Sequence, residues 1–309
     1  MDRPYLEPAL VLALHQTCRA HWMRLGVFLI LYAAAGGAAY GLVTFFHGTG
    51  WIYLVCLPLY LLAAAALHGV SLFTHEAVHG TLSPNPALNR ALGAVCAWPV
   101  LQNFAAYQVL HLRHHDHLGL PGDPDHYDNY TRWSWLVFAM HWGRLIVGYP
   151  AYVTAIPILG FRQGRGMERF WIAFEVACVV ILAFTVIASP IPRALLIHAW
   201  LIPMFFINTL VNIRGMSQHT LLEHQSDPIL GTRSILTNRV TAFFMCNENY
   251  HLEHHLYPGV PWYHLPRLHA ALREDLIARG APYIGSYFAF VREFMAGSLR
   301  RSPLGKPGR

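Results

Sequence analysis

Four long apolar stretches dominate the pattern of hydrophobic and polar positions along the chain: residues 25–46, 51–73, 170–190 and 194–213. Each is long enough for a helix that crosses a hydrocarbon core, which takes about 20 residues. The stretches form two pairs, and each pair is joined by a very short turn, at residues 47–50 and 189–193. The pattern predicts an all-α integral membrane protein with four transmembrane helices in two hairpins.

The segments between the hairpins are apolar but interrupted. Residues 86–107 and 133–160 contain prolines, amides and an arginine, namely Pro99, Gln102, Asn103, Arg144 and Pro150. Such interruptions favour interfacial or half-buried helices over full crossings.

The positive charges are unevenly distributed. Arginines are concentrated in the N-terminal segment, in residues 108–169 and after residue 213, whereas Lys306 is the only lysine. The positive-inside rule places these three regions in the cytoplasm, together with both termini. Residues 298–309 are basic and rich in Pro and Gly, which predicts a disordered tail near anionic lipid.

The composition supports a membrane protein with one catalytic unit. The 309 residues are 55% hydrophobic and only 12% charged, and no linker or repeat divides them, so we expect a single domain over residues 1–309. The net charge of +6 is consistent with anionic lipid and does not indicate nucleic acid as a partner. Five scattered cysteines predict no disulfide framework, and no secretory signal is expected at the N-terminus.

Three histidine clusters are the strongest chemical signal. The first has the spacing H-x₃-H, and the other two have the spacing H-x₂-H-H, so each cluster places its imidazoles on one face of a helix. On the predicted topology, all three clusters meet on the same side of the membrane. The clusters are His75 and His79; His111, His114 and His115; and His251, His254 and His255.

Eight imidazoles exceed the needs of one metal ion. Tetrahedral zinc takes four ligands, and a catalytic zinc takes only three from the protein, so two metals fit the clusters better. Imidazole binds iron, copper, nickel and zinc alike, and the ligand type alone does not select iron.

The three clusters and their surroundings resemble the membrane fatty-acid desaturase superfamily, which includes acyl desaturases, alkane and sterol hydroxylases, and carotenoid hydroxylases and ketolases. The closest likeness lies in residues 249–261 (NYHLEHHLYPGVP) and in the acidic turn at residues 122–125 (GDPD). The resemblance covers about residues 70–275. It implies a di-iron centre held by eight or nine histidines, O₂ as co-substrate, and a separate electron donor of the ferredoxin, rubredoxin or cytochrome type.

The resemblance also implies a further histidine ligand between the fourth apolar stretch and the third cluster. His219 and His224 are the two candidates, and we prefer His219 because it lies closer to the end of the stretch. Asparagine and acidic side chains are candidates for hydrogen bonds to the ligand imidazoles. These are Asn208, Asn212, Asn249, Glu76, Asp123, Asp125 and Glu253. Glu175 lies inside an apolar stretch, where pairing with His198 would account for it.

These residues predict an enzyme that uses O₂ to attack an unactivated C–H bond of a lipid held in an apolar slot between the helices. Desaturation of an acyl chain ranks first, since it is the commonest activity of the superfamily, and hydroxylation or ketolation of a lipid, alkane or carotenoid ranks second. A rival from another class is an intramembrane zinc metalloprotease, because residues 75–79 (HEAVH) satisfy H-E-x-x-H. The protease would leave both H-x₂-H-H clusters without a role.

Overall fold

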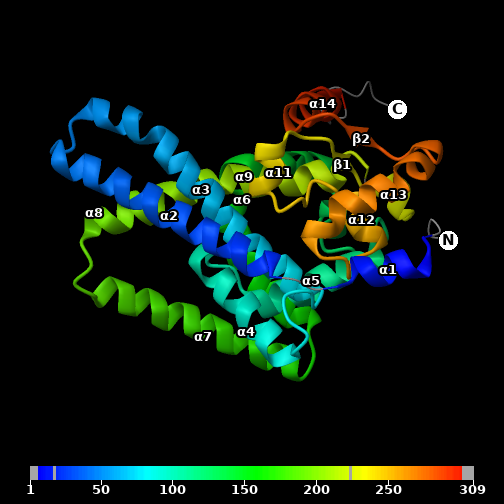
Figure 1. The fold of residues 1–309 in the computed structure, drawn as a ribbon, viewed down its shortest axis with the longest axis horizontal. Coiled ribbons are helices and arrows are strands. Elements are labelled where there is room, and N and C mark those ends of the chain that lie inside the picture. The colour runs from blue at the N-terminus through cyan, green and yellow to red at the C-terminus, as the bar shows by residue number, and fades with distance from the viewer. Residues whose placement is uncertain (1–5, 17–18, 223–224, 301–309) are drawn as a thin grey trace.

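The chain folds into long helices at one end and a cap of short elements at the other, as seen in a computed structural model that describes residues 6–16, 19–222 and 225–300 (Figure 1). The elements up to residue 129 are α1 (Pro8–Leu14), α2 (Ala20–Phe45), α3 (Gly50–Val78), α4 (Pro86–Ala97), η1 (Trp98–Val100), α5 (Phe104–His117) and η2 (Tyr127–Asn129). The next elements are α6 (Ser134–Gln163), α7 (Met167–Ala188), α8 (Arg193–Leu196), η3 (Ile197–Leu201) and α9 (Ile202–His219). The remainder are α10 (Pro228–Gly231), β1 (Ser234–Ile235), α11 (Arg239–Phe244), α12 (His251–Leu256), η4 (Trp262–His264), α13 (Leu265–Ala278), β2 (Tyr283–Ile284) and α14 (Tyr287–Arg300).

The first predicted hairpin is formed by α2 and α3, which pack against each other along their length (Figure 1). Its turn uses positive φ angles at His47 and Gly48, so the chain reverses within a few residues. Helix α3 extends five residues beyond the predicted end at residue 73. This extension carries the first histidine cluster out of the apolar stretch and into the cap.

The second predicted hairpin is formed by α7 and by the continuous run from α8 to α9, which ends at His219 rather than at residue 213. A π-helical turn, η3, interrupts the run. The expected pairing of Glu175 with His198 is wrong. Glu175 instead accepts a hydrogen bond from the amide of Ala105 at 3.0 Å, because the first amides of α5 have no partner within their own helix. His198 faces the other way, and its Nδ1 lies 2.7 Å from the hydroxyl of Tyr60 on α3.

Helix α6 complicates the predicted number of crossings. It has 30 residues with a kink at Val147, three residues before Pro150. Among the described residues, five helices are long and apolar enough to cross a membrane: α2, α3, α6, α7 and the run from α8 to α9. The structure is therefore that of an all-α integral membrane protein, but length and composition do not select four crossings.

The cap closes over the ends of α3, α5 and α9. Strands β1 and β2 form a two-residue parallel pair, and α12 packs on α13 and β1 (Figure 1). Leu14 of α1 joins Leu252 and Leu268 in one buried apolar cluster, so the N-terminal helix packs against the cap. Residues 298–300, predicted to start a disordered tail, are the end of α14, while residues 301–309 lie outside the described part of the chain.

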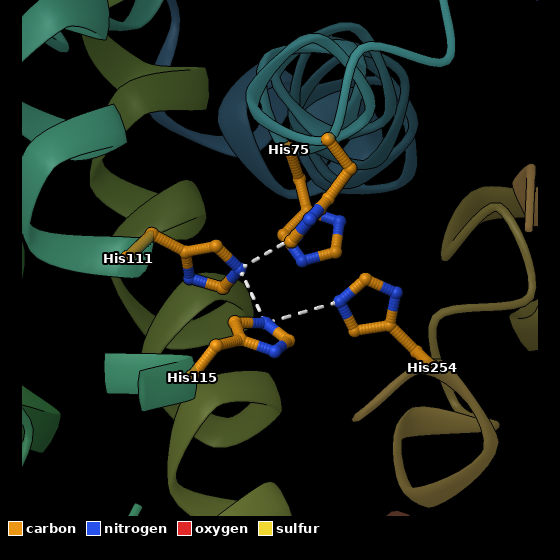
Figure 2. Close-up of side chains that lie close together, drawn as sticks. His75, His111, His115 and His254 are labelled. Atoms are coloured by element: carbon orange, nitrogen blue, oxygen red, sulfur yellow. Dashed lines mark hydrogen bonds between the residues drawn. The ribbon is translucent and has the colours of Figure 1, made fainter. Parts of the chain in front are cut away.

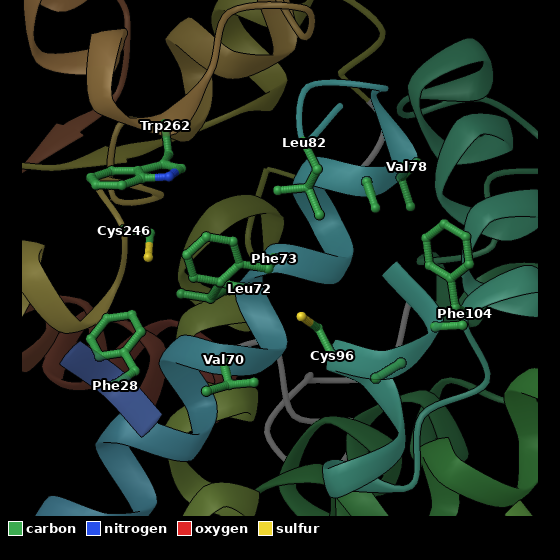
Figure 3. Close-up of a cluster of buried hydrophobic side chains, with 13 residues drawn as sticks. Phe28, Val70, Leu72, Phe73, Val78, Leu82, Cys96, Phe104, Cys246 and Trp262 are labelled. Atoms are coloured by element: carbon green, nitrogen blue, oxygen red, sulfur yellow. The ribbon is translucent and has the colours of Figure 1, made fainter. Parts of the chain in front are cut away.

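A second buried cluster joins the cap to the hairpins (Figure 3). Phe28 of α2, Phe73 of α3 and Trp262 of the cap are each at most 3% exposed and meet in this cluster. Cys96 and Cys246 also belong to it, and the cysteines at 56, 96, 178 and 246 are free thiols. The absence of a disulfide framework is thus confirmed for these four positions, and Cys18 lies outside the described residues.

Candidate metal centre

The three histidine clusters and His219 come together at the ends of four helices. The first cluster lies at the end of α3, the second in α5, the third in α12, and His219 is the last residue of α9. Seven of these nine histidines are buried, and His79 and His115 are half-buried. The convergence expected from the sequence is confirmed in space.

Five of the imidazoles form a first group, defined by His75, His79, His111, His115 and His254. One nitrogen from each ring lies within 4.8 Å of those of the others. The closest approaches are between Nε2 atoms: His79 to His111 at 3.1 Å, His111 to His115 at 3.1 Å, and His115 to His254 at 3.3 Å. Figure 2 shows four of these rings, His75, His111, His115 and His254, turned toward one common point.

The other four imidazoles form a second group. His114, His219 and His255 each offer a nitrogen within the same 4.8 Å limit, and His251 joins them with its Nε2 3.2 Å from Nε2 of His255. The two groups adjoin, because the rings of His115 and His255 stack with centroids 4.1 Å apart.

Each H-x₂-H-H cluster is divided between the two groups. In α5, the first and last histidines, His111 and His115, belong to the first group, and His114 belongs to the second. In α12 the division is reversed: His254 belongs to the first group, and His251 and His255 belong to the second. Residues i+3 and i+4 of a helix point about 100° apart, so one turn can reach two adjacent sites.

Two rings of the second group have a fixed tautomer. Nδ1 of His219 lies 3.0 Å from the carbonyl oxygen of Gly231, which can only accept, so this nitrogen carries the proton. Nδ1 of His114 lies 2.8 Å from Oδ1 of Asp123, a carboxylate that accepts in the same way. When both rings are neutral, their Nε2 atoms, which lie 3.2 Å apart, face each other with lone pairs. Two lone pairs in contact repel unless a cation lies between them, so this donor set fits a bound metal ion.

A glycine turn holds Asp123 in place. Gly119 has a φ of +68°, and a Cβ atom there would collide with the carbonyl group of Gln225. Its amide donates to Oδ2 of Asp123 at 3.1 Å. Asp123 is fully buried, whereas Asp125, which lies 3.8 Å from the same ring, has a side chain that is 57% exposed. Of the two acidic residues proposed for this turn, Asp123 is therefore the one that supports His114.

Glu248 is the residue that the sequence did not single out. Its Oε1 lies 2.8 Å from Nδ1 of His75, and its Oε2 lies 3.7 Å from Nδ1 of His251. The approach to His75 has ion-pair distance but not the alignment of a good hydrogen bond. Oε2 also lies 3.4 Å from a guanidinium nitrogen of Arg214. One buried carboxylate thus supports a histidine of each group; its position three residues before His251 was the only local signal.

The other expected partners are hydrogen-bonded to groups outside the nine histidines. Glu76 accepts hydrogen bonds from the Thr81 hydroxyl and the Trp262 amide, and its carboxylate also lies within 4.8 Å of a nitrogen of His75 and an oxygen of Glu248. Glu253 accepts from Ser234, His269 and Tyr283. The three asparagines bond to neighbouring backbone and side chains instead of to the nine histidines: Asn208 and Asn212 tie α9 to α6, and Asn249 bonds Ile235. His224 lies outside the described residues.

Burial keeps most of these imidazoles neutral. It lowers the pKa of His111, His254 and His255 well below the ordinary value, and neighbouring imidazoles lower it further. Burial lowers the pKa of His251 to about 4, although Glu248 opposes this. His114 is the exception, because Asp125 and Asp123 outweigh burial and raise its pKa. A neutral imidazole is the form that binds a metal ion.

A cavity of about 120 Å³ opens onto both groups. Its lining includes His75 and His111 of the first group and His114, His219 and His251 of the second. The rest of the lining is mixed and combines apolar side chains such as Leu72, Ile156 and Val211 with tyrosines, amides and arginines. This differs from the apolar slot that the sequence predicts.

Comparisons with known proteins give the family of the chain. The family model described as fatty acid desaturase matches residues 49–287. A β-carotene ketolase of Paracoccus sp. (strain PC1) is 25% identical over 70% of this chain and 86% of its own length. An sn-1 oleoyl-lipid 12-desaturase of Arthrospira platensis is 22% identical over 71% and 70%, and a dihydrorhizobitoxine desaturase of Bradyrhizobium elkanii is 25% identical over 73% and 69%.

The chain belongs to the fatty acid desaturase family, because the match covers most of its length. It is an oxidoreductase of the kind represented by the desaturases and ketolases it resembles. Its buried histidine groups are compatible with metal binding.

Proposed function

We propose that this protein is a di-iron membrane oxidoreductase that uses O₂ to oxidise an unactivated C–H bond of a lipid, with desaturation of an acyl chain as its reaction. The observation that carries the proposal is the pair of adjacent histidine groups whose Nε2 atoms face one another at 3.1 to 3.3 Å. Two sites this close, each with at least four imidazoles, suit two metal ions that act together.

We assign one iron to each group. His75, His79, His111, His115 and His254 would hold the first, and His114, His219, His251 and His255 would hold the second. When bound, the two irons would supply the reduction of O₂ and the removal of hydrogen from a methylene group. The chain itself fixes the rings: Asp123 and the Gly231 carbonyl orient His114 and His219, and Glu248 orients His75 and His251.

The cavity is the natural place for the reacting carbon, because it touches histidines of both groups. Its walls hold the substrate at a fixed distance from the metal site and limit the access of water. A separate ferredoxin, rubredoxin or cytochrome would deliver the electrons. The lipid bilayer would deliver the substrate, and no nucleic acid is involved.

Ketolation or hydroxylation is the second candidate reaction. It is favoured by the ketolase of Paracoccus, which this chain matches over 86% of that enzyme's length. Mass spectrometry of the lipids and carotenoids of cells that express the protein, incubated in air with a reducing system, separates the two reactions. Loss of two hydrogen atoms indicates desaturation, a gained oxygen atom indicates the second candidate, and no oxidised product from either class contradicts the proposal.

We also propose four membrane crossings, with α6 lying along the surface. His79 and His219 belong to one centre through the contacts of His111 and His114, so the chain between them crosses an even number of times. Three candidate spans, α6, α7 and the run from α8 to α9, lie in that interval. One of them therefore does not cross.

The contacts of α6 support its assignment as that helix. Near its start, the Trp142 indole donates to Ser298 of the cap at 2.9 Å. Near its end, a Cβ on Gly160 would lie 2.7 Å from Cβ of Ala106 in α5. Helix α7 then starts beside the same helix, since the Asn103 amide donates to the Ile172 carbonyl at 3.0 Å. Both ends of α6 thus stay on the side of the histidines.

Single cysteines at Ser134, Arg165 and Ile191 test this topology, because all three positions are exposed. We expect the first two to react with a membrane-impermeant thiol reagent from the cytoplasmic side and the third from the opposite side. Labelling of Ser134→Cys and Arg165→Cys from opposite sides would show that α6 crosses.

The zinc protease makes opposite demands on Glu76. As a general base, this carboxylate would need to face a metal-bound water, but its Oε2 is occupied by Thr81 at 2.7 Å and by the amide of Trp262. We expect the purified protein to hold about two irons per chain and Glu76→Gln to retain them. One tightly bound zinc, together with peptide cleavage that Glu76→Gln abolishes, would establish the protease instead.

A further inference from the structure

Three of the residues that line the cavity carry buried nitrogen atoms that have no partner. These are Nε2 of Gln218, Nε of Arg214 and Nε2 of His68, each without a hydrogen bond within the part of the chain that the structure describes. All three residues line the cavity that touches both histidine groups. Buried polar atoms almost always have a hydrogen-bond partner, so three such atoms around one cavity indicate that its occupant supplies it.

The unpartnered atoms call for an acceptor. The amide nitrogen of Gln218 and Nε of Arg214 can only donate, and His68 can donate through Nε2 in one of its tautomers. Arg144 and Arg214 also line the cavity, whereas Asp125 is the single carboxylate in the described lining. These nitrogen donors therefore suit oxygen atoms that are neutral or negative, such as those of a carbonyl, carboxyl or hydroxyl group.

Two of these groups lie close to the candidate ligands. Gln218 directly precedes His219, and Arg214 lies 3.4 Å from Glu248, which contacts His75. His68 precedes His75 by seven residues, which is two helical turns or about 10 Å along the same face of α3. A substrate oxygen bound at Gln218 and Arg214 would therefore lie near a carbon held at the histidines.

The lining also contains apolar side chains, namely Leu72, Leu110, Ile156, Leu159 and Val211. The cavity thus offers both apolar contacts and unpaired donors beside the metal site. A mid-chain methylene segment would leave the three nitrogen atoms desolvated and unpaired. A lipid whose oxygenated end enters the cavity would satisfy the donors as well as the apolar side chains.

We propose that the substrate is a lipid with an oxygen-bearing group that binds Gln218 and Arg214, with His68 as a further donor in the same cavity, and that the oxidised carbon lies within a few bonds of this group. The inference rests on the proposed oxidation at the histidine groups and adds the part of the substrate that is placed there. It separates oxidation near a polar end from oxidation in the middle of a chain.

The test compares three probes of equal chain length: octadecane, octadecanol and methyl octadecanoate. Binding to the metal-loaded protein in detergent is measured without reductant, so no turnover occurs. We expect at least one oxygenated probe to bind about tenfold more tightly than octadecane, because it pairs the buried donors. Equal binding of all three probes would overturn the inference.

Matched variants locate the preference. Gln218→Leu should reduce it to within about threefold, while Gln163→Leu should keep it. Gln163 also has a buried amide atom without a partner, but it does not line the cavity. His68→Leu repeats the test away from the candidate ligands, and the iron content of each variant is measured beside binding. A preference that survives in both Gln218→Leu and His68→Leu would contradict the assignment.

Failure of this inference can be told from failure of the proposed function. If the protein prefers oxygenated probes yet oxidises no lipid, the proposed binding site is supported and the proposed reaction is contradicted. A protein that oxidises a lipid far from any oxygen, as located by fragmentation of the product, keeps the reaction and overturns the placement of the substrate.

Discussion

The two histidine groups differ in how their rings are supported. In the second group, Nδ1 of His114 and Nδ1 of His219 are held by Asp123 and by the Gly231 carbonyl. In the first group, which has five rings, Oε1 of Glu248 lies 2.8 Å from Nδ1 of His75. The smaller group thus has the more firmly fixed rings, and the larger group has more donors.

This difference has a chemical consequence. Removing one ring leaves three donors in the second group and four in the first, and a site with fewer remaining donors holds its metal ion less tightly. We therefore expect the second group to be more sensitive to single substitutions. Variants that remove one ring from each group test this difference in sensitivity.

The largest effect is expected for His219→Ala. It removes a ring fixed at the end of α9 and leaves three donors in the second group. Iron should fall from about two to about one per chain, and lipid oxidation should be abolished. Elemental analysis of the purified protein measures the iron, and His224→Ala is the control that should retain it. If His224→Ala loses iron and His219→Ala does not, the assignment of the ninth ligand is reversed.

Neighbouring histidines of α5 give the next test, because they belong to different groups. His114→Ala should lower the iron content to about one per chain, whereas His111→Ala should leave four donors in the first group and retain more iron. Both variants should lose most of the activity, so the readout is metal content. Greater loss of iron in His111→Ala would show that the difference in support between the groups is not the controlling factor.

Glu248, three residues before the third cluster, and Glu253, inside the cluster, make a matched pair of buried carboxylates. Glu248→Gln should weaken iron binding about 10- to 100-fold, because it removes the charge beside His75 and His251. Glu253→Gln should leave iron affinity unchanged and lower the free energy of unfolding by about 1–3 kcal/mol, because Glu253 accepts hydrogen bonds from Ser234, His269 and Tyr283. Metal titration and thermal unfolding separate the two outcomes. Equal losses of affinity would refute the distinction.

The smallest effect is expected at the acidic turn. Asp123→Asn should weaken iron binding at the second group by about tenfold, since the buried carboxylate orients His114. Asp125→Asn should change iron affinity little, because that side chain is 57% exposed and 3.8 Å from the ring. Competition with a chelator, followed at equilibrium, is sensitive enough for this comparison. A larger effect at Asp125 would assign the supporting role to it instead.

The order of residues along the chain determined the helices of this protein and the faces on which its histidines lie. The apolar runs specified the helices of both hairpins, because a helix in lipid must satisfy its backbone internally and present apolar side chains outward. The spacing of eight histidines specified their faces on three helices, since i and i+4 coincide on any α-helix. His219 followed from its distance to the end of an apolar run. For these features, neighbours in sequence carry the information.

Tertiary structure decided how those local pieces meet. The division of each H-x₂-H-H cluster between two groups depends on how α5 and α12 face each other, and no spacing within either helix encodes it. The partners of Glu175 and His198 were likewise decided by which helices pack together. The role of Glu248 depends on three distant elements, which bring His75, His251 and Arg214 to its two carboxylate oxygens. Helix periodicity is a property of one segment, whereas a contact between segments depends on crossing angles and turns that the whole chain sets together.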